Sequence, residues 1–196
     1  RFSVKRLFAI GDVHGCIDEL RELLALIDDR FVVGEDMLMF LGDLVDRGPG
    51  SIEVVELVKA LCDQGVAKVV SGNHDSIYPS YKDGKNVALH GAKAELYAQM
   101  NNTHFNFLRS NPHAIRFDIE GQGRPWVAVH AGLEPAFPLE QQDPYRLERV
   151  RIVHPDTGLM VYREKVEETI VPVFWTRRYQ GSENVVYGHF VHDLEK

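Results

Sequence analysis

Five short, glycine-containing motifs hold most of the side chains in this sequence that could do chemistry. In chain order they are Gly11-Asp12-Val13-His14-Gly15, Gly42-Asp43-Leu44-Val45-Asp46-Arg47-Gly48, Gly72-Asn73-His74-Asp75, His130-Ala131-Gly132-Leu133 and Tyr187-Gly188-His189. Their carboxylate, amide and imidazole groups form a ligand set that suits manganese, iron or zinc better than a metal that prefers thiolates. Two such ions can hold a water molecule, lower its pKa and clamp the oxygens of a phosphoryl group. The motifs therefore predict a two-metal site that hydrolyses a phosphate ester.

Six residues of these motifs are the candidate metal ligands: Asp12, His14, Asp43, Asn73, His130 and His189. Asp12 and His14 are two positions apart, so both can turn toward one ion where a strand ends. Asp43 is placed to bridge two ions, and the remaining three residues would complete the second. Each motif alone is also compatible with an ordinary structural turn. The arrival of several ligand-type residues at successive strand ends favours the metal site.

Three further residues of the motifs have predicted catalytic roles. Arg47 can bind a phosphate through both arms of its guanidinium, although a lone arginine is more commonly a solvated surface charge. His74, beside the ligand Asn73, is placed to protonate the leaving oxygen. Asp46 could hold that imidazole in the tautomer that this role requires.

The elements that position these motifs follow from the hydrophobic pattern. Apolar runs predict strands over residues 6–10, 37–41 and 67–70, and apolar residues at helical spacing predict helices after residues 18 and 51. Strands that alternate with helices indicate an α/β fold with parallel pairing. Ligands gather beyond the carboxyl ends of such strands, where the first three motifs lie.

The second half of the chain has a weaker pattern. We expect helices over residues 91–100 and 105–109, a hairpin of strands 114–119 and 126–129, and short strands over residues 171–175 and 184–187. Residues 80–86 are predicted to form a loop. The region from about 139 to 170 is charged and irregular, and we interpret it as loops or a cap over the site. Residues 1–196 are accordingly expected to form a single domain.

Composition limits the classes of partner. The formal net charge of −7 argues against stable binding to nucleic acid, although a metal pair could still attract a phosphorylated substrate. The sequence holds no run of 18 apolar residues, so no membrane span is expected. Cys16 and Cys62 are too few for a disulfide framework, which is compatible with a reducing, cytoplasmic compartment.

The ordered motifs resemble those of the calcineurin-like metallophosphoesterases, and most closely the phosphoprotein-phosphatase branch with its bacterial and phage members. The resemblance extends from about Phe8 to His189. It implies a four-layer αββα fold with two mixed β-sheets, and two divalent ions, of which manganese is expected first and iron or zinc next. By this resemblance, Asp12 and His14 bind the first ion, and Asp43 bridges the two ions. The ligands of the second ion are Asn73, His130 and His189. The resemblance likewise makes Arg47 a phosphate contact and His74 a general acid supported by Asp46.

The sequence departs from the protein phosphatases at several positions. Ser71 and Asp75 stand where those enzymes usually carry arginine and glutamate. Gly-Asn-His-Asp, together with Gly48-Pro49, looks more like diadenosine tetraphosphatases and bacterial polynucleotide end-healing phosphatases. A second phosphate-binding arginine is common in the family, and we predict Arg177, with Arg163 and Arg178 as alternatives. His192 lies one residue too far along for the Gly-His-x-His pattern and is left out of the ligand set.

The sequence thus predicts a binuclear metallohydrolase that cleaves phosphate monoesters by attack of a metal-bound hydroxide, without a covalent enzyme intermediate. Phosphoserine or phosphothreonine in proteins is the first expected substrate. Dinucleoside polyphosphates such as diadenosine tetraphosphate are the second, and phosphorylated polynucleotide ends are the third. The alternative of another class is a metal-binding scaffold without activity. The presence of every ligand position and of His74 favours the enzyme.

Overall fold

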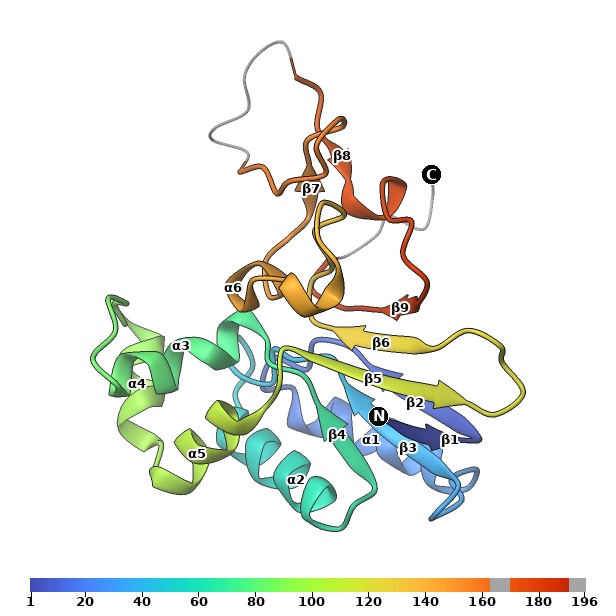
Figure 1. Cartoon of the computed structure of the whole chain (residues 1–196). Helices are drawn as coiled ribbons and strands as arrows, with labels where there is room; N and C mark the ends of the chain where they lie inside the picture. The colour runs from blue at the N-terminus through green and yellow to red at the C-terminus, as the bar shows by residue number, and fades with distance from the viewer. Residues whose placement is uncertain (163–169, 191–196) are drawn as a thin grey trace.

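The computed structural model describes residues 1–162 and 170–190, and two β-sheets form its centre (Figure 1). The first sheet has the order β2-β3-β4 and is parallel throughout. Its strands are β2 (Arg6–Ile10), β3 (Asp36–Phe40) and β4 (Ala67–Val69). The crossovers are α1 (Ile17–Asp28) and α2 (Ser51–Asp63). The predicted alternation of strands and helices is confirmed for this half of the chain.

The second sheet has the order β1-β5-β6-β9 and is mixed. Its strands are β1 (Phe2–Val4), β5 (Ala114–Ile119), β6 (Trp126–Val129) and β9 (Asn184–Val186). β5 and β6 pair antiparallel, as the predicted hairpin requires, whereas β1 runs parallel to β5 and β9 runs parallel to β6. The two-sheet α/β fold is therefore confirmed. The three-stranded sheet is parallel instead of mixed because each of its connections is a helical crossover.

Three apolar clusters hold the layers together. Phe40, Val69 and their neighbours pack under α1, α2 and the helices that follow β4. Met39 and Leu41 meet Phe117 between the two sheets, where all three side chains are buried. The third cluster lies on the outer face of the second sheet and contains Val127, Val129, Leu133, Leu147, Val150, Val153 and Trp175. Both sheets are thus covered on each face, as strands with apolar side chains on both sides require.

Three helices follow β4: α3 (Asn73–Lys82), α4 (Ala92–Gln99) and α5 (Asn102–Ser110). The prediction of a loop over residues 80–86 was wrong at its start, because α3 continues through Lys82. The helix was missed because few of its residues are apolar. Tyr78, which is fully buried, anchors it to the core instead. The two helices predicted over residues 91–100 and 105–109 are confirmed as α4 and α5.

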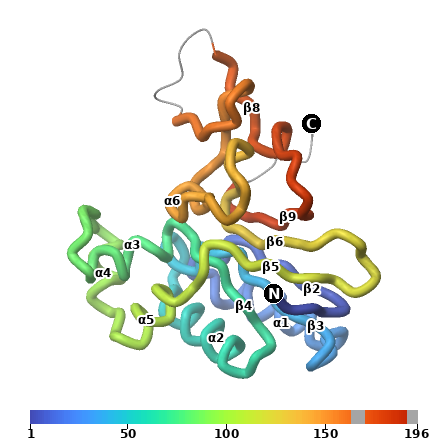
Figure 2. Tube along the Cα trace, in the orientation of Figure 1, coloured from blue at the N-terminus to red at the C-terminus, as the bar shows by residue number. Residues whose placement is uncertain are grey.

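The outer cluster is covered by a segment that we call the cap segment, residues 139–162 and 170–179 (Figure 2). It contains η1 (Leu139–Gln141), α6 (Pro144–Leu147), β7 (Ile152–Val153), β8 (Val173–Phe174) and η3 (Trp175–Arg177). β7 and β8 form a small antiparallel sheet of their own. The described part of the region predicted to be irregular therefore contains short helices and strands joined by loops.

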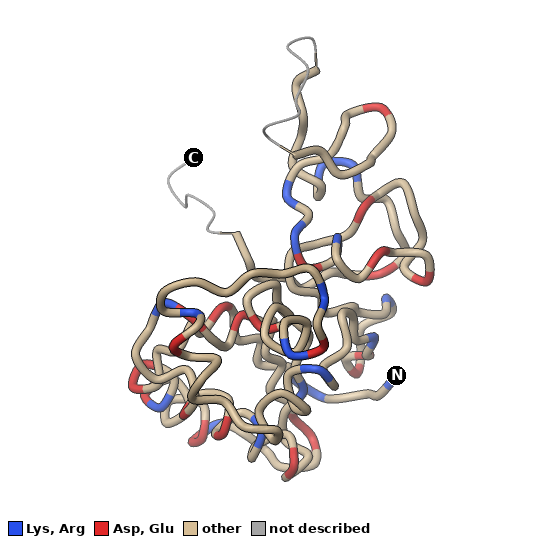
Figure 3. The backbone as a smooth tube through the Cα atoms, turned by 90° about the vertical axis from the view of Figure 1, so that its left-hand side faces the viewer, with Lys and Arg blue, Asp and Glu red and all other residues tan. Residues whose placement is uncertain are grey.

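Where the structure describes the chain, charged residues do not gather on one part of the molecule. Acidic and basic residues are interspersed along the backbone in both the two-sheet body and the cap segment (Figure 3). Among residues 1–162 and 170–190, no helix has both the length and the apolar composition that a bilayer crossing requires.

Candidate metal centre

The first three motifs lie at the carboxyl ends of β2, β3 and β4, and their backbones approach each other closely. A Cβ atom on Gly42 would lie 2.6 Å from the backbone nitrogen of Gly72. A Cβ atom on Gly72 would in turn lie 2.2 Å from the backbone nitrogen of Asp43. Both positions therefore exclude any side chain. This contact between two turns brings Asp43 beside the motif that begins with Gly72.

Asp43 lies at the middle of the cluster and is almost completely buried. Its Oδ2 is 3.6 Å from Nε2 of His14 and 3.3 Å from Nε2 of His130. Its Oδ1 accepts a hydrogen bond of 2.9 Å from the backbone N–H of His74. One carboxylate oxygen thus faces a histidine on each side, which is the arrangement expected of a ligand shared by two ions.

His14 and His130 are each held in one tautomer by a backbone carbonyl. Nδ1–H of His14 donates to the carbonyl oxygen of Val45 over 2.8 Å, and Nδ1–H of His130 donates to that of Leu41 over 2.6 Å. In both rings Nε2 points into the cluster, and it carries the lone pair when the ring is neutral. Nε2 of His14 is buried and has no hydrogen-bond partner among residues 1–162 and 170–190. A buried lone pair without a partner is costly in a folded protein, and a metal ion would satisfy it.

The other three candidate ligands, Asp12, Asn73 and His189, lie next to His14 and His130. His130 Nε2 lies 3.2 Å from Oδ1 of Asn73 and 3.0 Å from Nδ1 of His189. Asp12 Oδ1 accepts the backbone N–H of His189 over 2.8 Å, and its Oδ2 is 3.9 Å from Nε2 of His14. All six residues predicted as ligands are therefore brought together. Two groups of potential ligand atoms stand out in the part of the chain that the structure describes: His14, Asp43 and His74, and Asp43, His130 and His189.

The electrostatics of the cluster favour a cation. Burial raises the pKa of Asp43, but the hydrogen bond and charge of His130 outweigh this and leave the pKa below its usual value. Burial, followed by the charges of His130 and Arg151, lowers the pKa of His189 to about 3. Asp43 is therefore an anion and His189 a neutral imidazole near neutral pH. Both are in the protonation state that a metal ion requires of its ligands. Burial lowers the pKa of His130, but the hydrogen bond and charge of Asp43 outweigh this and raise it, so a metal ion would displace a proton from this ring.

Backbone strain is concentrated at this site. In the described residues, the positions other than glycine that have a positive φ angle are His14 (48°), Asp43 (52°), Asp46 (71°), Arg47 (69°) and His189 (64°). Each belongs to the predicted site. The left-handed region costs an L-residue about 1–2 kcal/mol, and such residues persist where the surrounding structure holds them. Observed strain of this kind is typical of functional turns.

His74 and Asp46 form the pair that the sequence predicted. Nδ1–H of His74 donates to Oδ2 of Asp46 over 2.6 Å. Two residues that the sequence did not single out contact the same carboxylate. Tyr78 donates its hydroxyl to Oδ1, and Lys93 places Nζ 2.6 Å from Oδ2. Burial raises the pKa of Asp46, but the hydrogen bonds from His74, Lys93 and Tyr78 hold it at about 2.

Arg47 lies beside this pair on the exposed rim of a cavity of about 610 Å³. The cavity is enclosed by the turn around Asp46, the start of α2, His74 and the inner face of α4. Among the described residues no ion pair with the Arg47 guanidinium is found, so it is available to an anion. No motif in the sequence pointed to Lys93, because a lysine on an amphipathic helix is ordinarily a solvated residue.

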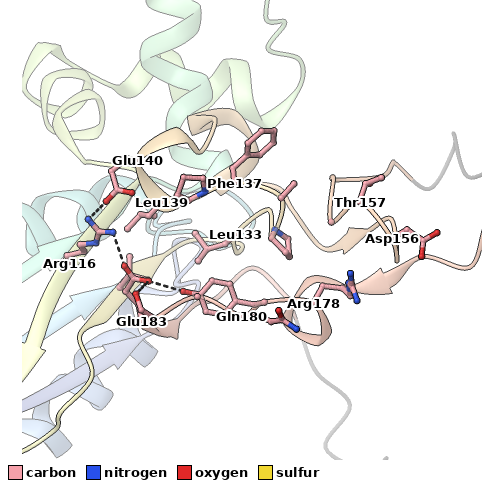
Figure 4. A pocket seen from close by; sticks show the side chains of 18 residues that line it. Arg116, Leu133, Phe137, Leu139, Glu140, Asp156, Thr157, Arg178, Gln180 and Glu183 are labelled. Atoms are coloured by element: carbon pink, nitrogen blue, oxygen red, sulfur yellow. Dashed lines mark hydrogen bonds and ion pairs between the residues drawn. The ribbon is translucent and has the colours of Figure 1, made fainter.

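The second phosphate-binding arginine was predicted less well. Arg177 is exposed at the end of η3, and no contact joins it to the ligand cluster in the described residues. Arg178 lines a different cavity, of about 590 Å³, between the second sheet and the cap segment (Figure 4). None of the six candidate ligands lines that cavity, and Arg116 there is already paired with Glu140 and Glu183. Arg163 and His192 lie outside the described residues.

The cap segment supplies two residues at the edge of the cluster. Nε–H of Arg151 donates to Nε2 of His189 over 2.9 Å. Glu148 is buried and accepts hydrogen bonds of 2.7 Å from the hydroxyls of Ser71 and Ser76, on either side of the ligand Asn73. Ser71, which departs from the protein-phosphatase pattern, therefore has a structural partner. Neither cap residue could be predicted, because both act across a long sequence separation.

Asp75, the other departure, is completely buried. Its Oδ1 accepts the backbone N–H of Leu44 over 2.8 Å, and its Oδ2 accepts that of Gly72 over 3.3 Å. Burial and the nearby charge of Asp43 raise the pKa of this carboxyl group. Asp75 thus joins the turn after β3 to the start of α3, and it does not face the cavity.

Comparison with known proteins gives consistent results. A family model described as calcineurin-like phosphoesterase matches residues 5–193. A protein of Psychromonas ingrahamii named "Bis(5'-nucleosyl)-tetraphosphatase, symmetrical" is 37% identical over 146 residues, which are 72% of this chain and 49% of that protein. A protein of Klebsiella pneumoniae (strain 342) with the same name is 40% identical over 135 residues, which are 68% of this chain and 45% of its own length. The chain therefore spans about half the length of these curated relatives.

A solved structure is similar over nearly the whole chain. It is described as the crystal structure of a "putative diadenosine tetraphosphatase", and it aligns with a TM-score of 0.72 and 28% identity. The alignment covers 95% of this chain and 78% of that one. A tyrosine phosphatase of a Shewanella species, at 22% identity and a TM-score of 0.50, shares the fold.

Proposed function

This chain belongs to the calcineurin-like phosphoesterase family, and on that premise we propose that it is a two-metal hydrolase of dinucleoside polyphosphates such as diadenosine tetraphosphate. The observation that supports the metal chemistry is the cluster of His14, His130 and His189 around Asp43. In this cluster the buried Nε2 of His14 has no hydrogen-bond partner among the described residues. The substrate class is supported by the names of the relatives, which are tetraphosphatases.

The proposed ligands divide between two ions. Asp12 and His14 would hold the first, and Asn73, His130 and His189 the second, while Asp43 would contact both. Bound divalent ions supply Lewis acidity at the phosphorus and lower the pKa of water. The chain's own residues fix the ligand atoms. The carbonyl groups of Val45 and Leu41 orient the two imidazoles, and the contact between Gly42 and Gly72 places the central carboxylate.

His74 would act as the general acid. When it is protonated, Nδ1–H stays on Asp46 and the proton on Nε2 passes to the oxygen that leaves phosphorus. Asp46 remains ionised throughout, because its pKa is about 2. Arg47, free of protein partners in the described residues, would bind phosphoryl oxygens beside it.

The relatives favour a nucleotide substrate over the phosphoprotein that we expected first. Ser71 and Asp75, which depart from the protein-phosphatase pattern, are occupied by contacts with Glu148 and with the backbone N–H of Leu44. The dinucleoside polyphosphate alternative is accordingly the main proposal, and the phosphoprotein is the second.

The test is a direct one. The purified chain with Mn²⁺ is given diadenosine tetraphosphate, a phosphoserine peptide and a 3′-phosphorylated oligonucleotide in competition, and the products are separated by chromatography. We expect ADP to be the main product, since symmetrical cleavage yields two molecules of it. Asp43→Asn should lower the rate by about 10²–10³-fold, because a single group that stabilises charge in the transition state is commonly worth that much.

Asp63→Asn serves as the matched control, because Asp63 is an exposed carboxylate on α2 that pairs with Lys59. This variant should retain the full rate. Turnover of the phosphopeptide alone would replace the main proposal with the second one. Binding of Mn²⁺ without turnover of any of the three substrates would support the scaffold and contradict both.

A further inference from the structure

The cavity between α2 and α4 lies on the side of the site where a leaving group must be. His74 lines it, and His74 is the proposed proton donor to the oxygen that departs. The departing group must therefore lie within reach of that imidazole, on the side that the cavity occupies. Its volume of about 610 Å³ is well within the range of about 300–1,000 Å³ that small-molecule sites occupy.

Two cations border this cavity beside His74. Arg47 has no ion pair with the described residues, and Lys93 places its Nζ 2.6 Å from Oδ2 of Asp46 and 3.5 Å from Nδ1 of His74. Within residues 1–162 and 170–190, the ammonium group of Lys93 pairs with one carboxylate, that of Asp46. An ammonium group has three N–H donors. Donors remain that can face the cavity. The first turn of α2 also lines the cavity; its N–H groups attract an anion, while its Glu53 carries a negative charge at the same end of the helix.

The rest of the wall is suited to a flat, partly apolar group. Ile52 and Leu96 are half-buried on it, and Gln99 offers an amide at its far end. Two exposed glutamates, Glu53 and Glu95, also line the cavity. The phosphates would therefore lie at the end beside His74, where Lys93 and Arg47 supply positive charge. The aliphatic side chains of Ile52 and Leu96 suit a nucleoside that follows the phosphates. A serine leaving group would be neutral and would have no use for two cations.

We propose that this cavity binds the nucleoside diphosphate that leaves during hydrolysis, with Lys93 and Arg47 holding its phosphates. The inference rests on the proposed function. In the step, water gives up one proton to the solvent and its oxygen forms a bond to one of the two central phosphorus atoms, while the bond from that phosphorus to the bridging oxygen breaks. The bridging oxygen departs on the second ADP and takes the proton from Nε2 of His74. Because Lys93 would hold the phosphates of this departing ADP, it would favour a charged leaving group over a neutral one.

The test uses the Mn²⁺-loaded chain and compares Lys93→Met with Lys93→Arg. Lys59→Met is the matched control, because Lys59 is a helical lysine that also pairs with one aspartate but does not line the cavity. The two substrates are diadenosine tetraphosphate and p-nitrophenyl phosphate. Both leaving groups are weak bases of similar strength, so both depend similarly on His74, but only the first is a nucleotide.

We expect Lys93→Met to lower kcat/KM for diadenosine tetraphosphate by about 10–100-fold more than kcat/KM for p-nitrophenyl phosphate. Loss of the contact with Asp46 acts on both substrates, whereas loss of the contact with the leaving phosphates acts on the first alone. Lys93→Arg should retain most of the preference, and Lys59→Met all of it. An equal loss on both substrates would mean that Lys93 only positions Asp46 and His74, which would overturn the proposal.

A second measurement separates this inference from the proposed function. ADP and inorganic phosphate are tested as inhibitors of p-nitrophenyl phosphate hydrolysis, and ADP binding is followed by calorimetry. We expect Lys93→Met to raise the inhibition constant of ADP by about 10-fold and to leave that of phosphate unchanged. If the wild type cleaves no dinucleoside polyphosphate, the proposed function is wrong. The inhibition by ADP still shows whether the cavity binds a nucleoside diphosphate through Lys93. Equal inhibition by ADP in the wild type and Lys93→Met would contradict the inference.

Discussion

His14 presents a single atom whose surroundings make sense only with a further partner. Its Nδ1–H donates to the carbonyl oxygen of Val45, and its buried Nε2 has no hydrogen-bond partner in the part of the chain that the structure describes. We expect His14→Ala to bind one Mn²⁺ ion fewer per chain, or to bind it at least about 10–100-fold more weakly, since groups that only orient a ligand are already worth that much. The measurement is metal content after equilibrium dialysis. His90→Ala, at an exposed position, should retain the wild-type stoichiometry, and equal metal content in both variants would refute the assignment.

Asp46 gives a prediction about pH. Its pKa is about 2 in the folded chain and about 3.8 when unfolded, so the folded state gains the full advantage above pH 3.8. As the pH falls below 3.8, the unfolded chain takes up the proton first and the advantage is lost. In metal-free protein, the difference in unfolding free energy between the wild type and Asp46→Asn should therefore shrink by about 1 kcal/mol between pH 5 and pH 3.

Urea unfolding at several pH values measures this difference. Asp63→Asn, at an exposed carboxylate, should leave the wild-type pH profile almost unchanged. A constant difference between the wild type and Asp46→Asn across this range would show that the carboxylate is not held by His74, Lys93 and Tyr78 in solution.

At the scale of elements, Glu148 joins the cap segment to the start of α3. Its buried carboxylate accepts the hydroxyls of Ser71 and Ser76 and an N–H of Arg149. Glu148→Ala leaves those donors unsatisfied, and we expect it to lower the free energy of unfolding by about 2–4 kcal/mol. Because the two serines flank Asn73, Mn²⁺ affinity should fall as well.

Denaturant unfolding and metal titration of the same variant check both effects. Glu140→Ala removes an exposed partner of Arg116 and should change stability much less. Loss of stability without any change in Mn²⁺ affinity would mean that the cap segment does not position the ligand turn.

The sequence predicted elements well where local pattern decides them. The strands over residues 114–119 and 126–129 match β5 and β6 because alternation and the turn at residues 121–125 are local signals. The helix α3 was missed because its stability comes from one buried tyrosine and from its contact with α5, not from apolar periodicity. The six ligand candidates could be named because glycine-flanked polar residues at strand ends are visible in sequence. Lys93, Arg151 and Glu148 could not, because their roles depend on which distant segments meet.

At the scale of the whole molecule, the candidate ligands extend from Asp12 to His189 and come from both sheets. Metal binding should therefore stabilise the native state as a unit. At a free Mn²⁺ concentration of 100 times the dissociation constant, one site contributes about 2.7 kcal/mol. We expect the melting temperature to rise with Mn²⁺ and to fall on addition of a chelator, as calorimetry would show.

Asp43→Asn should lose most of this rise, whereas Asp63→Asn should keep it. A melting temperature that is independent of Mn²⁺ in the wild type would argue against ions held between the two sheets.

The five strained residues of the site have a consequence for mutational tolerance. At Arg47, whose side chain is exposed and whose φ angle is 69°, glycine would relieve an unfavourable backbone conformation. We expect Arg47→Gly to be more stable than Arg47→Ala by about 1 kcal/mol, although both lose activity. A library scored for cellular abundance should therefore accept glycine at this turn, and the same library scored for phosphoester hydrolysis should reject it. Positions that accept a substitution in the abundance score and reject it in the hydrolysis score are those where the residue is kept for catalysis at a cost in stability.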